Sequence, residues 1–104
     1  MLDATFAALA EPRRRAILRE LGDDELTAGE IASRFSVTRP AISQHLAVLR
    51  SARLVEERRD GTRRWYRANR EGLVPVRDWV GSFWDARLDA LRTAVDAANE
   101  ETDR

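Results

Sequence analysis

The chain has 104 residues with eighteen basic and eighteen acidic side chains, so its formal net charge is zero, and this length predicts one domain over residues 1–104. It has no cysteine, which excludes disulfides, thiolate metal sites and cysteine nucleophiles. It has neither a charged leader followed by an apolar run nor an apolar segment long enough to cross a bilayer, so we expect a soluble, cytoplasmic protein with no membrane partner.

Two short helices are expected at the start of the chain. Residues 3–10 predict the first, with Phe6 and Leu9 facing inward, and Glu11-Pro12 begins the second, which ends at Gly22. Residues 13–15 are all arginine and stand at the start of the second helix, where positive charge opposes the helix dipole. They predict a phosphate or acidic partner, or else simple exposure beside the acidic residues 23–25.

The stretch from Thr27 to Leu49 encodes two short capped helices joined by a tight turn. Thr27 can cap the first helix while Glu30 reaches back to the cap, and residues 36–38 form the turn. Thr38 is the cap of the second helix, and Pro40 is tolerated in its first turn because the missing N–H has no intrahelical partner there. This spacing predicts a helix-turn-helix.

The outward face of the second helix carries small and polar groups. Its apolar residues fix the inward face, namely Ile42, Leu46 and Leu49, which leaves outward Pro40, Ser43, Gln44, Ala47 and Ser51. No acid occurs between Arg34 and Glu56. With Arg39 and Arg50 at its flanks, this face predicts a helix that enters a DNA groove between two rows of phosphates, the alternative being an ordinary solvated face.

The charges are unevenly distributed. Residues 34–70 hold ten arginines and three acids, a net charge of +7, between blocks of net −3 before and −4 after. Every basic residue is arginine, which favours forked phosphate contacts, although a GC-rich genome produces the same bias. The positive block contains the proposed groove helix.

A β-hairpin follows. Residues 54–59 and 63–68 flank the turn dipeptide Asp60-Gly61. Four arginines crowd its tip: Arg58, Arg59, Arg63 and Arg64. Such a cluster repels itself unless a polyanion lies there, so we expect the hairpin to be a DNA-contacting wing rather than a solvated turn.

A long helical pattern closes the chain over about residues 76–98. Its apolar residues recur every three or four positions: Val76, Trp79, Val80, Phe83, Trp84, Leu88, Leu91 and Val95. So much aromatic surface would be exposed on a small monomer, which predicts a homodimer interface. The fold expected is therefore mainly α with a small β-hairpin, a winged helix-turn-helix of about five helices and a two-stranded wing.

Three segments together resemble the ArsR/SmtB family of dimeric bacterial repressors. They are LAEPRRRAILREL (9–21), IASRFSVTRPAISQHLAVLRSARLVEERRDGTRRWYRAN (31–69) and the Trp-rich last helix. The resemblance implies a recognition helix from Thr38 to about Ser51, a wing around Asp60-Gly61, and a dimer held by the first and last helices, about 3–10 and 76–98. The implied interface residues are Phe6, Leu9, Val76, Trp79, Val80, Phe83, Trp84, Leu88 and Leu91.

The chain departs from the metal-sensing relatives. Where thiol-sensing members carry a Cys-x-Cys pair this sequence has Thr27 and Gly29, which do not bind a soft metal. The last helix has Asp78, Asp85, Asp89 and Asp96 but no histidine, and such carboxylates are far more often charge decoration than a zinc site. We therefore expect a member without metal sensing and without a cofactor, and leave any small-molecule effector open.

Some residue roles stay open between two interpretations. His45, the single histidine, touches a phosphate or packs beside the buried face. Ser43 and Gln44 are the best base or phosphate contacts, and Arg39 reads guanine or neutralises a phosphate. The three tryptophans line a ligand pocket or, as is commoner for such stripes, belong to core and interface: Trp65, Trp79 and Trp84.

The function predicted is a homodimeric, sequence-specific repressor that binds a palindromic operator in double-stranded DNA. The DNA-contacting residues predicted are Thr38, Arg39, Pro40, Ser43, Gln44, His45, Arg50, Arg58, Arg59, Arg63 and Arg64. The alternative is a winged-helix module that binds protein instead of DNA. An enzyme is not expected, because the chain offers one histidine, no cysteine and no Gly-rich phosphate loop.

Overall fold

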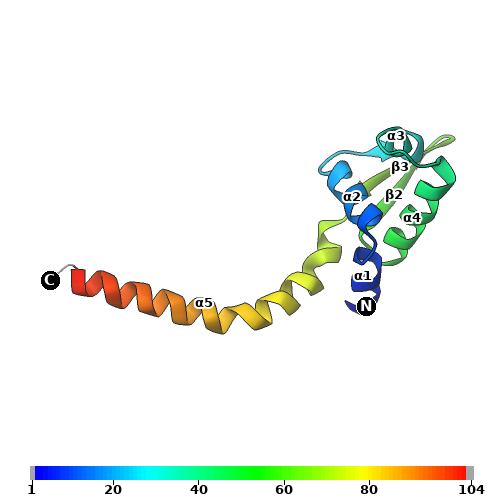
Figure 1. The fold of residues 1–104 in the computed structure, drawn as a ribbon. Coiled ribbons are helices and arrows are strands. Elements are labelled where there is room, and N and C mark those ends of the chain that lie inside the picture. Colours follow the sequence, from blue (N-terminus) through cyan, green and yellow to red (C-terminus); the bar gives the residue numbers. More distant parts are fainter. Residues whose placement is uncertain (1, 103–104) are drawn as a thin grey trace. The chain divides into compact units, whose positions relative to one another are not determined.

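The computed structural model describes residues 2–102, which belong to two compact units, Met1–Val74 and Pro75–Arg104. The first unit contains, in chain order, α1 (Leu2–Leu9), α2 (Pro12–Leu21), β1 (Leu26–Thr27), α3 (Ala28–Ser33), α4 (Arg39–Ser51), β2 (Val55–Asp60), β3 (Arg63–Ala68) and the 3-10 helix η1 (Arg70–Leu73) (Figure 1). The second unit is the helix α5 (Val74–Thr102), whose first residue closes the first unit. The mainly helical winged helix-turn-helix that we predicted is confirmed.

The helix starts follow from local hydrogen bonds. Thr27 and Glu30 form the predicted capping box: the Thr27 Oγ1 accepts from the Glu30 N–H, and the Glu30 carboxylate accepts from the Thr27 N–H. Thr38 caps α4 by accepting from the Ala41 N–H at 3.3 Å. Gly22 ends α2 with a φ of 51° and donates its N–H to the Leu18 carbonyl. Both caps of the helix-turn-helix and the end of α2 are therefore confirmed.

One hydrophobic core holds the first unit together. The periodicity correctly places three α4 residues inside, and all of them are fully buried: Ile42, Leu46 and Leu49. They meet Ile17 and Leu21 of α2, together with buried side chains from the other elements, Ala8, Leu26, Ala28, Ile31, Leu54, Val55 and Tyr66. Each large apolar side chain buried in this way contributes about 1.5 to 3 kcal/mol.

The sheet has one strand more than predicted. Within the described residues it is antiparallel with the order β1-β3-β2, and β1 pairs Leu26 with Tyr66 and Thr27 with Trp65. Two residues are too few to show the alternation by which a strand is recognised in a sequence. The extra strand brings the start of α3 against the wing.

The hairpin turn lies one residue later than predicted. Asp60 belongs to β2 and pairs with Arg63, so the loop consists of Gly61 and Thr62. Gly61 has a φ of 63°, and among the described residues of the loop it alone has a positive φ. That pattern matches a type II′ turn, in which glycine occupies the first central position, rather than the type I′ turn favoured by Asp-Gly.

The inward face of α1 also differs from the prediction. Its buried residues are Thr5 and Ala8, and Leu9 packs on the core as expected, but Phe6 is 36% exposed. A helix of eight residues presents one narrow stripe, and here the small Ala8 occupies the closest approach. Phe6 is therefore not a core residue of the first unit.

The arginines at the start of α2 have a structural partner that we did not predict. Arg14 Nε donates to the Ala8 carbonyl at 2.6 Å, and Arg15 Nη1 donates to the Leu9 carbonyl at 2.7 Å. The remaining one, Arg13, lies over the Phe35 ring at 5.0 Å. Two of the three thus cap the carbonyl end of α1, where positive charge is favourable, and neither a phosphate nor an acidic residue is needed to explain them.

We expect Arg14→Ala to lower the free energy of unfolding by about 1 to 2 kcal/mol, because it removes charged hydrogen bonds to two carbonyls of α1, Ala7 and Ala8. Urea unfolding followed by circular dichroism measures the change. Arg19→Ala removes an exposed arginine from the same helix and serves as the control. Equal losses for the two variants would contradict the capping role.

A tight corner connects α4 to β2. The N–H groups of Arg53 and Leu54 donate to the carbonyls of Arg50 and Leu49, which is a Schellman motif with Arg53 at a φ of 61°. Asn69 donates its Nδ2 to the Arg53 carbonyl at 2.9 Å. Gly72 of η1 lies directly against the same carbonyl, where an added Cβ would be 2.1 Å from the oxygen.

The second unit is one helix of about 43 Å at 1.5 Å per residue. It begins before and ends after the predicted residues 76–98. Its apolar stripe is exposed by 39 to 60% at Trp79, Val80, Phe83, Trp84, Leu88, Leu91 and Val95. Among the described residues, no helix combines the length and apolar character needed to span a bilayer.

Candidate nucleic-acid interface

The outward face of α4 is as the periodicity predicts. All five residues expected there are exposed: Pro40, Ser43, Gln44, Ala47 and Ser51. His45 is half-buried beside the inward row, which agrees with its predicted place on the helix and leaves both of its interpretations open. The helix therefore presents a surface of small and polar groups, with the exposed Arg39 at its start and Arg50 near its end.

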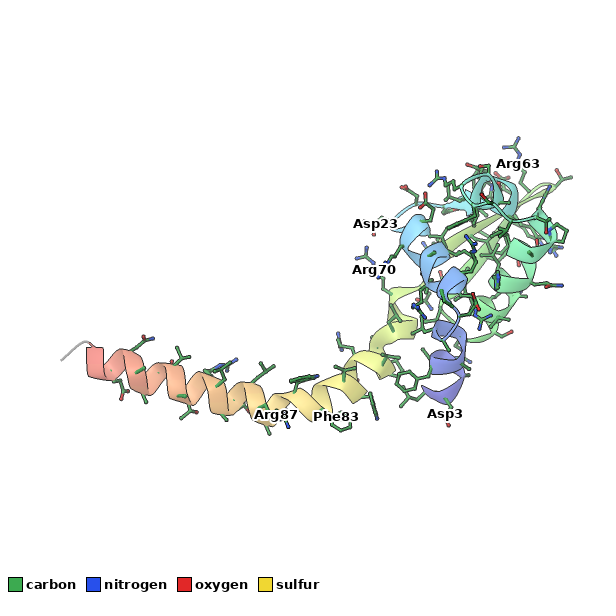
Figure 2. All side chains as sticks on the ribbon, in the orientation of Figure 1. Asp3, Asp23, Arg63, Arg70, Phe83 and Arg87 are labelled. Atoms are coloured by element: carbon green, nitrogen blue, oxygen red, sulfur yellow. The ribbon has the colours of Figure 1, made fainter. Side chains whose placement is uncertain are left out.

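A cleft of about 630 Å³ opens between α4 and the wing. One wall carries Arg39 and Ser43 of α4, and the other carries residues of the hairpin end, Thr62, Arg63 and Arg64. Its floor comes from the start of α3 and from the sheet, namely Thr27, Ala28, Gly29, Glu30 and Tyr66. Figure 2 shows Arg63 projecting outward from the end of the hairpin.

The cleft is positively charged. Three arginines face a single acid, Glu30, in its lining. That carboxylate already accepts hydrogen bonds from the N–H and the hydroxyl of Thr27. A strand of phosphates entering between α4 and the wing would therefore meet guanidinium donors on both walls.

The four wing arginines do not crowd one face. The register pairs Arg59 with Arg64 and Arg58 with Trp65, and successive residues of a strand point to opposite faces. Arg58 is engaged on the face away from α4: its guanidinium is 2.9 Å from the Glu25 carboxylate and lies over the Trp65 ring at 5.9 Å. Arg58 thus lies outside the cleft, whose lining includes four of the predicted contacts, Arg39, Ser43, Arg63 and Arg64.

Three of the predicted DNA contacts meet at one carboxylate. Glu57 of β2 lies 2.5 Å from Arg50 Nη1, 3.5 Å from Arg64 Nε and 3.6 Å from Arg59 Nε. The Glu57 side chain is 7% exposed, whereas the three arginines are 55 to 68% exposed. We call this group the Glu57 cluster; it connects the end of α4 with both strands of the wing.

Further ion pairs lie outside the cleft, one on the outer face of the sheet and one at the start of η1. Arg67 lies 2.7 Å from Glu56, and Arg70 pairs with Asp23, as Figure 2 shows. The hydrogen bond to Glu56, followed by its charge, raises the pKa of Arg67 above its ordinary value. These arginines are neutralised by neighbours outside the cleft.

Sequence reasoning found the cations of this site but missed their surroundings. It did not predict Glu57 as a common partner, nor that Thr27, Glu30, Thr62 and Tyr66 line the cleft. The hairpin signal could have located Thr62 at the tip. The convergence on Glu57 depends on how β2 lies against α4, which no local pattern encodes.

No metal centre is formed by the described side chains, among which no three histidines, cysteines or carboxylates gather. The three tryptophans are divided between the two units of the chain. Trp79 and Trp84 border a shallow hollow on α5 together with Val80, Phe83 and Arg87, and Trp65 is half-buried in β3. Trp79 and Phe83 pack edge to face, with ring centroids 4.8 Å apart.

Comparison with known proteins agrees with this geometry. A helix-turn-helix domain family matches residues 9–58. The HTH-type transcriptional regulator Rv2034 of Mycobacterium tuberculosis is 41% identical over 96% of this chain and 94% of its own length. The transcriptional repressor SdpR of Bacillus subtilis is 34% identical over 79% of this chain and 91% of its own.

A solved structure gives the same result. An ArsR-like transcriptional regulator from Rhodococcus sp. RHA1 superposes with a TM-score of 0.71 at 35% identity, covering 92% of this chain and 91% of that one. These relatives are transcriptional regulators and none of their names describes an enzyme.

Proposed function

The chain belongs to the ArsR/SmtB family of winged helix-turn-helix transcriptional regulators, and on that premise we propose that it is a homodimeric repressor of a palindromic operator. Each α4 enters the major groove of one half-site, and each wing lies over the flanking backbone. Bound to a promoter, the dimer represses by occluding it. We further propose that it does so without responding to a metal.

The observation that carries DNA binding is the cleft between α4 and the wing. It brings Arg39 and Ser43 of the helix opposite Arg63 and Arg64 of the hairpin. A recognition helix in a groove and a wing across the adjacent backbone need cations on both sides of a phosphate row. Gln44 is exposed on the same face of α4, which supports our proposal that its amide contacts base edges and addresses adenine.

Dimerisation is supported by the exposed apolar stripe of α5. Its side chains recur at helical spacing, and the acids Asp78, Asp89 and Asp96 fall on the opposite side of the helix at 3.6 residues per turn. An amphipathic helix with this much exposed aromatic and aliphatic surface needs a partner of the same kind. A second copy provides one by symmetry, and a palindromic operator follows from a two-fold dimer.

The proposal that no metal is sensed rests on the donor set. Thr27 and Gly29, at the positions of the cysteine pair of thiol-sensing relatives, form part of the capped start of α3 and the cleft floor. A hydroxyl that already caps a helix is a poor ligand for a soft metal.

Salt dependence tests the cleft. We expect Arg63→Ala/Arg64→Ala to reduce the slope of log K against log [salt] by about 3 to 4 for a dimer, since each phosphate neutralised contributes about 0.9. Fluorescence anisotropy on a duplex selected by the wild-type protein from a random pool measures the slope. The matched control is Arg67→Ala/Arg70→Ala, which removes the same charge from β3 and η1, outside the cleft.

An equal change in both double variants would remove the wing from the interface. If the wild-type protein retains no duplex at 50 mM salt, the protein-binding module becomes the better interpretation of the fold.

A further inference from the structure

We propose that Glu57 is a positioning residue for DNA recognition: its carboxylate holds Arg50, Arg59 and Arg64 as a preformed phosphate clamp between α4 and the wing. The inference rests on the proposed DNA binding and assigns a role to an acid, the residue type that a DNA-binding surface ordinarily excludes. It starts from the contrast in exposure within the Glu57 cluster.

The carboxylate is covered while its partners face solvent. A nearly buried ionised carboxylate is retained only where cations and hydrogen bonds compensate the lost hydration. Here the compensation comes from three guanidinium groups, of which the Arg50 Nη1 makes a hydrogen bond at 2.5 Å. All three partners of the carboxylate are arginines, whose guanidinium groups are cations in proteins.

The three arginines remain exposed to solvent while they contact Glu57. A guanidinium carries five N–H donors in a rigid fork, and the contact with Glu57 is made by Nη1 of Arg50 and by Nε of Arg59 and Arg64. The side chains of the three arginines are 55 to 68% exposed, so a phosphate can reach them from solvent. A carboxylate placed behind three cations therefore orients them toward the surface instead of competing for them there.

The three arginines come from three different elements. Arg50 lies near the end of α4, Arg59 on β2 and Arg64 on β3, and Arg64 also lines the cleft. Because one carboxylate, that of Glu57, holds all three side chains, it sets the distance between the recognition helix and the wing. Phosphate contacts of this kind set the register of a protein on its duplex, so their loss affects the docked, specific complex more than loose, non-specific binding.

The test compares variants of two neighbouring acids. Glu57→Gln removes the single negative charge of the cluster, and Glu56→Gln removes a negative charge from the outer face, where Glu56 pairs with Arg67. We expect both variants to bind a random-sequence duplex slightly more tightly than wild type, and to the same extent. The reason is that each loses one negative charge, so the net charge of each rises by one. For the duplex selected by the wild-type protein, the two variants should differ. There, Glu57→Gln should bind on the order of tenfold more weakly than Glu56→Gln.

Glu57→Asp separates position from charge. It keeps the carboxylate but retracts it by about 1.5 Å, one C–C bond, which breaks the contact with Arg50. We expect this variant to lose affinity for the selected duplex as Glu57→Gln does, while its thermal unfolding matches that of Glu56→Gln. Without DNA, the Nε–H resonances of Arg59 and Arg64 should shift in Glu57→Gln and stay unchanged in Glu56→Gln.

Three results would overturn the inference. The first is equal affinity of Glu57→Gln and Glu56→Gln for the selected duplex, and the second is wild-type affinity in Glu57→Asp. The third is that the arginine resonances stay unchanged in Glu57→Gln. This result alone would overturn the clamp, even if that variant is too unstable for binding assays. In each case wild-type DNA binding stands, whereas a wild-type protein that binds neither duplex overturns the proposed function together with the clamp.

Discussion

Gly72→Ala is expected to lower the free energy of unfolding by about 3 kcal/mol and the melting temperature by more than about 10 °C. The added Cβ would lie 2.1 Å from the Arg53 carbonyl oxygen and 2.9 Å from its carbon. Both atoms are backbone, so no side-chain rotation relieves the clash, and either η1 or the corner after α4 has to move.

The corner is unable to move without losing hydrogen bonds. The Arg53 carbonyl accepts from Asn69 Nδ2, and the Asn69 N–H donates to the Leu54 carbonyl at 2.8 Å. Arg53 already occupies a left-handed conformation that costs about 1 to 2 kcal/mol in a non-glycine residue. Shifting this segment also disturbs Leu54, which is fully buried in the core.

Gly29→Ala is the matched control for Gly72→Ala. Gly29 lies within α3, and an added Cβ there meets only the Thr27 hydroxyl, at 3.9 Å. Alanine is the better helix former by about 0.8 to 1 kcal/mol, so this variant should be as stable as wild type or more stable. Differential scanning calorimetry of the two variants measures both effects, and a Gly72→Ala protein that melts within a degree or two of wild type would show that the corner is not rigid.

Features of the fold that are local in sequence were predicted. The Thr27–Glu30 capping box and the Thr38 cap depend on residues three positions apart, and the buried row of α4 depends on helical periodicity alone. Features that depend on tertiary contacts were missed. β1 exists because Leu26 and Thr27 pair with β3, forty residues later, and Arg14 turns back to the carbonyls of the preceding helix.

For the candidate site, the cations were likewise predicted from the sequence, but their arrangement was not. The excess of arginine between residues 34 and 70 and the acid-free face of α4 identified the cations. Their arrangement was not predicted, because it depends on the register of the hairpin. Placing the turn at Gly61-Thr62 sets Arg59 and Arg64 on the same face as Glu57 and puts Arg58 on the other, where Glu25 and Trp65 hold it.

The largest functional effect is expected from the apolar stripe of α5. Leu88→Glu/Leu91→Glu places two carboxylates in the middle of a surface that is 53 and 60% exposed in the single chain. If a second copy covers that stripe, each protomer then buries two unpaired charges, and the dimer dissociates. Sedimentation equilibrium should show a dimer for the wild-type protein and a monomer for the variant.

Loss of the dimer should weaken binding to a full palindrome by about 10² to 10⁴-fold, because the second half-site is no longer bound at the effective concentration of a linked partner. Affinity for a duplex with one half-site should stay within about twofold of that of the wild-type protein for the same duplex, since α4 and the wing belong to the first unit. Ser82→Glu/Thr93→Glu adds the same charge to the side of the helix that carries Asp78 and Asp89 and is expected to remain dimeric. A Leu88→Glu/Leu91→Glu protein that stays dimeric would place the interface elsewhere, and a monomer that retains full affinity for the palindrome would show that one chain recognises the operator alone.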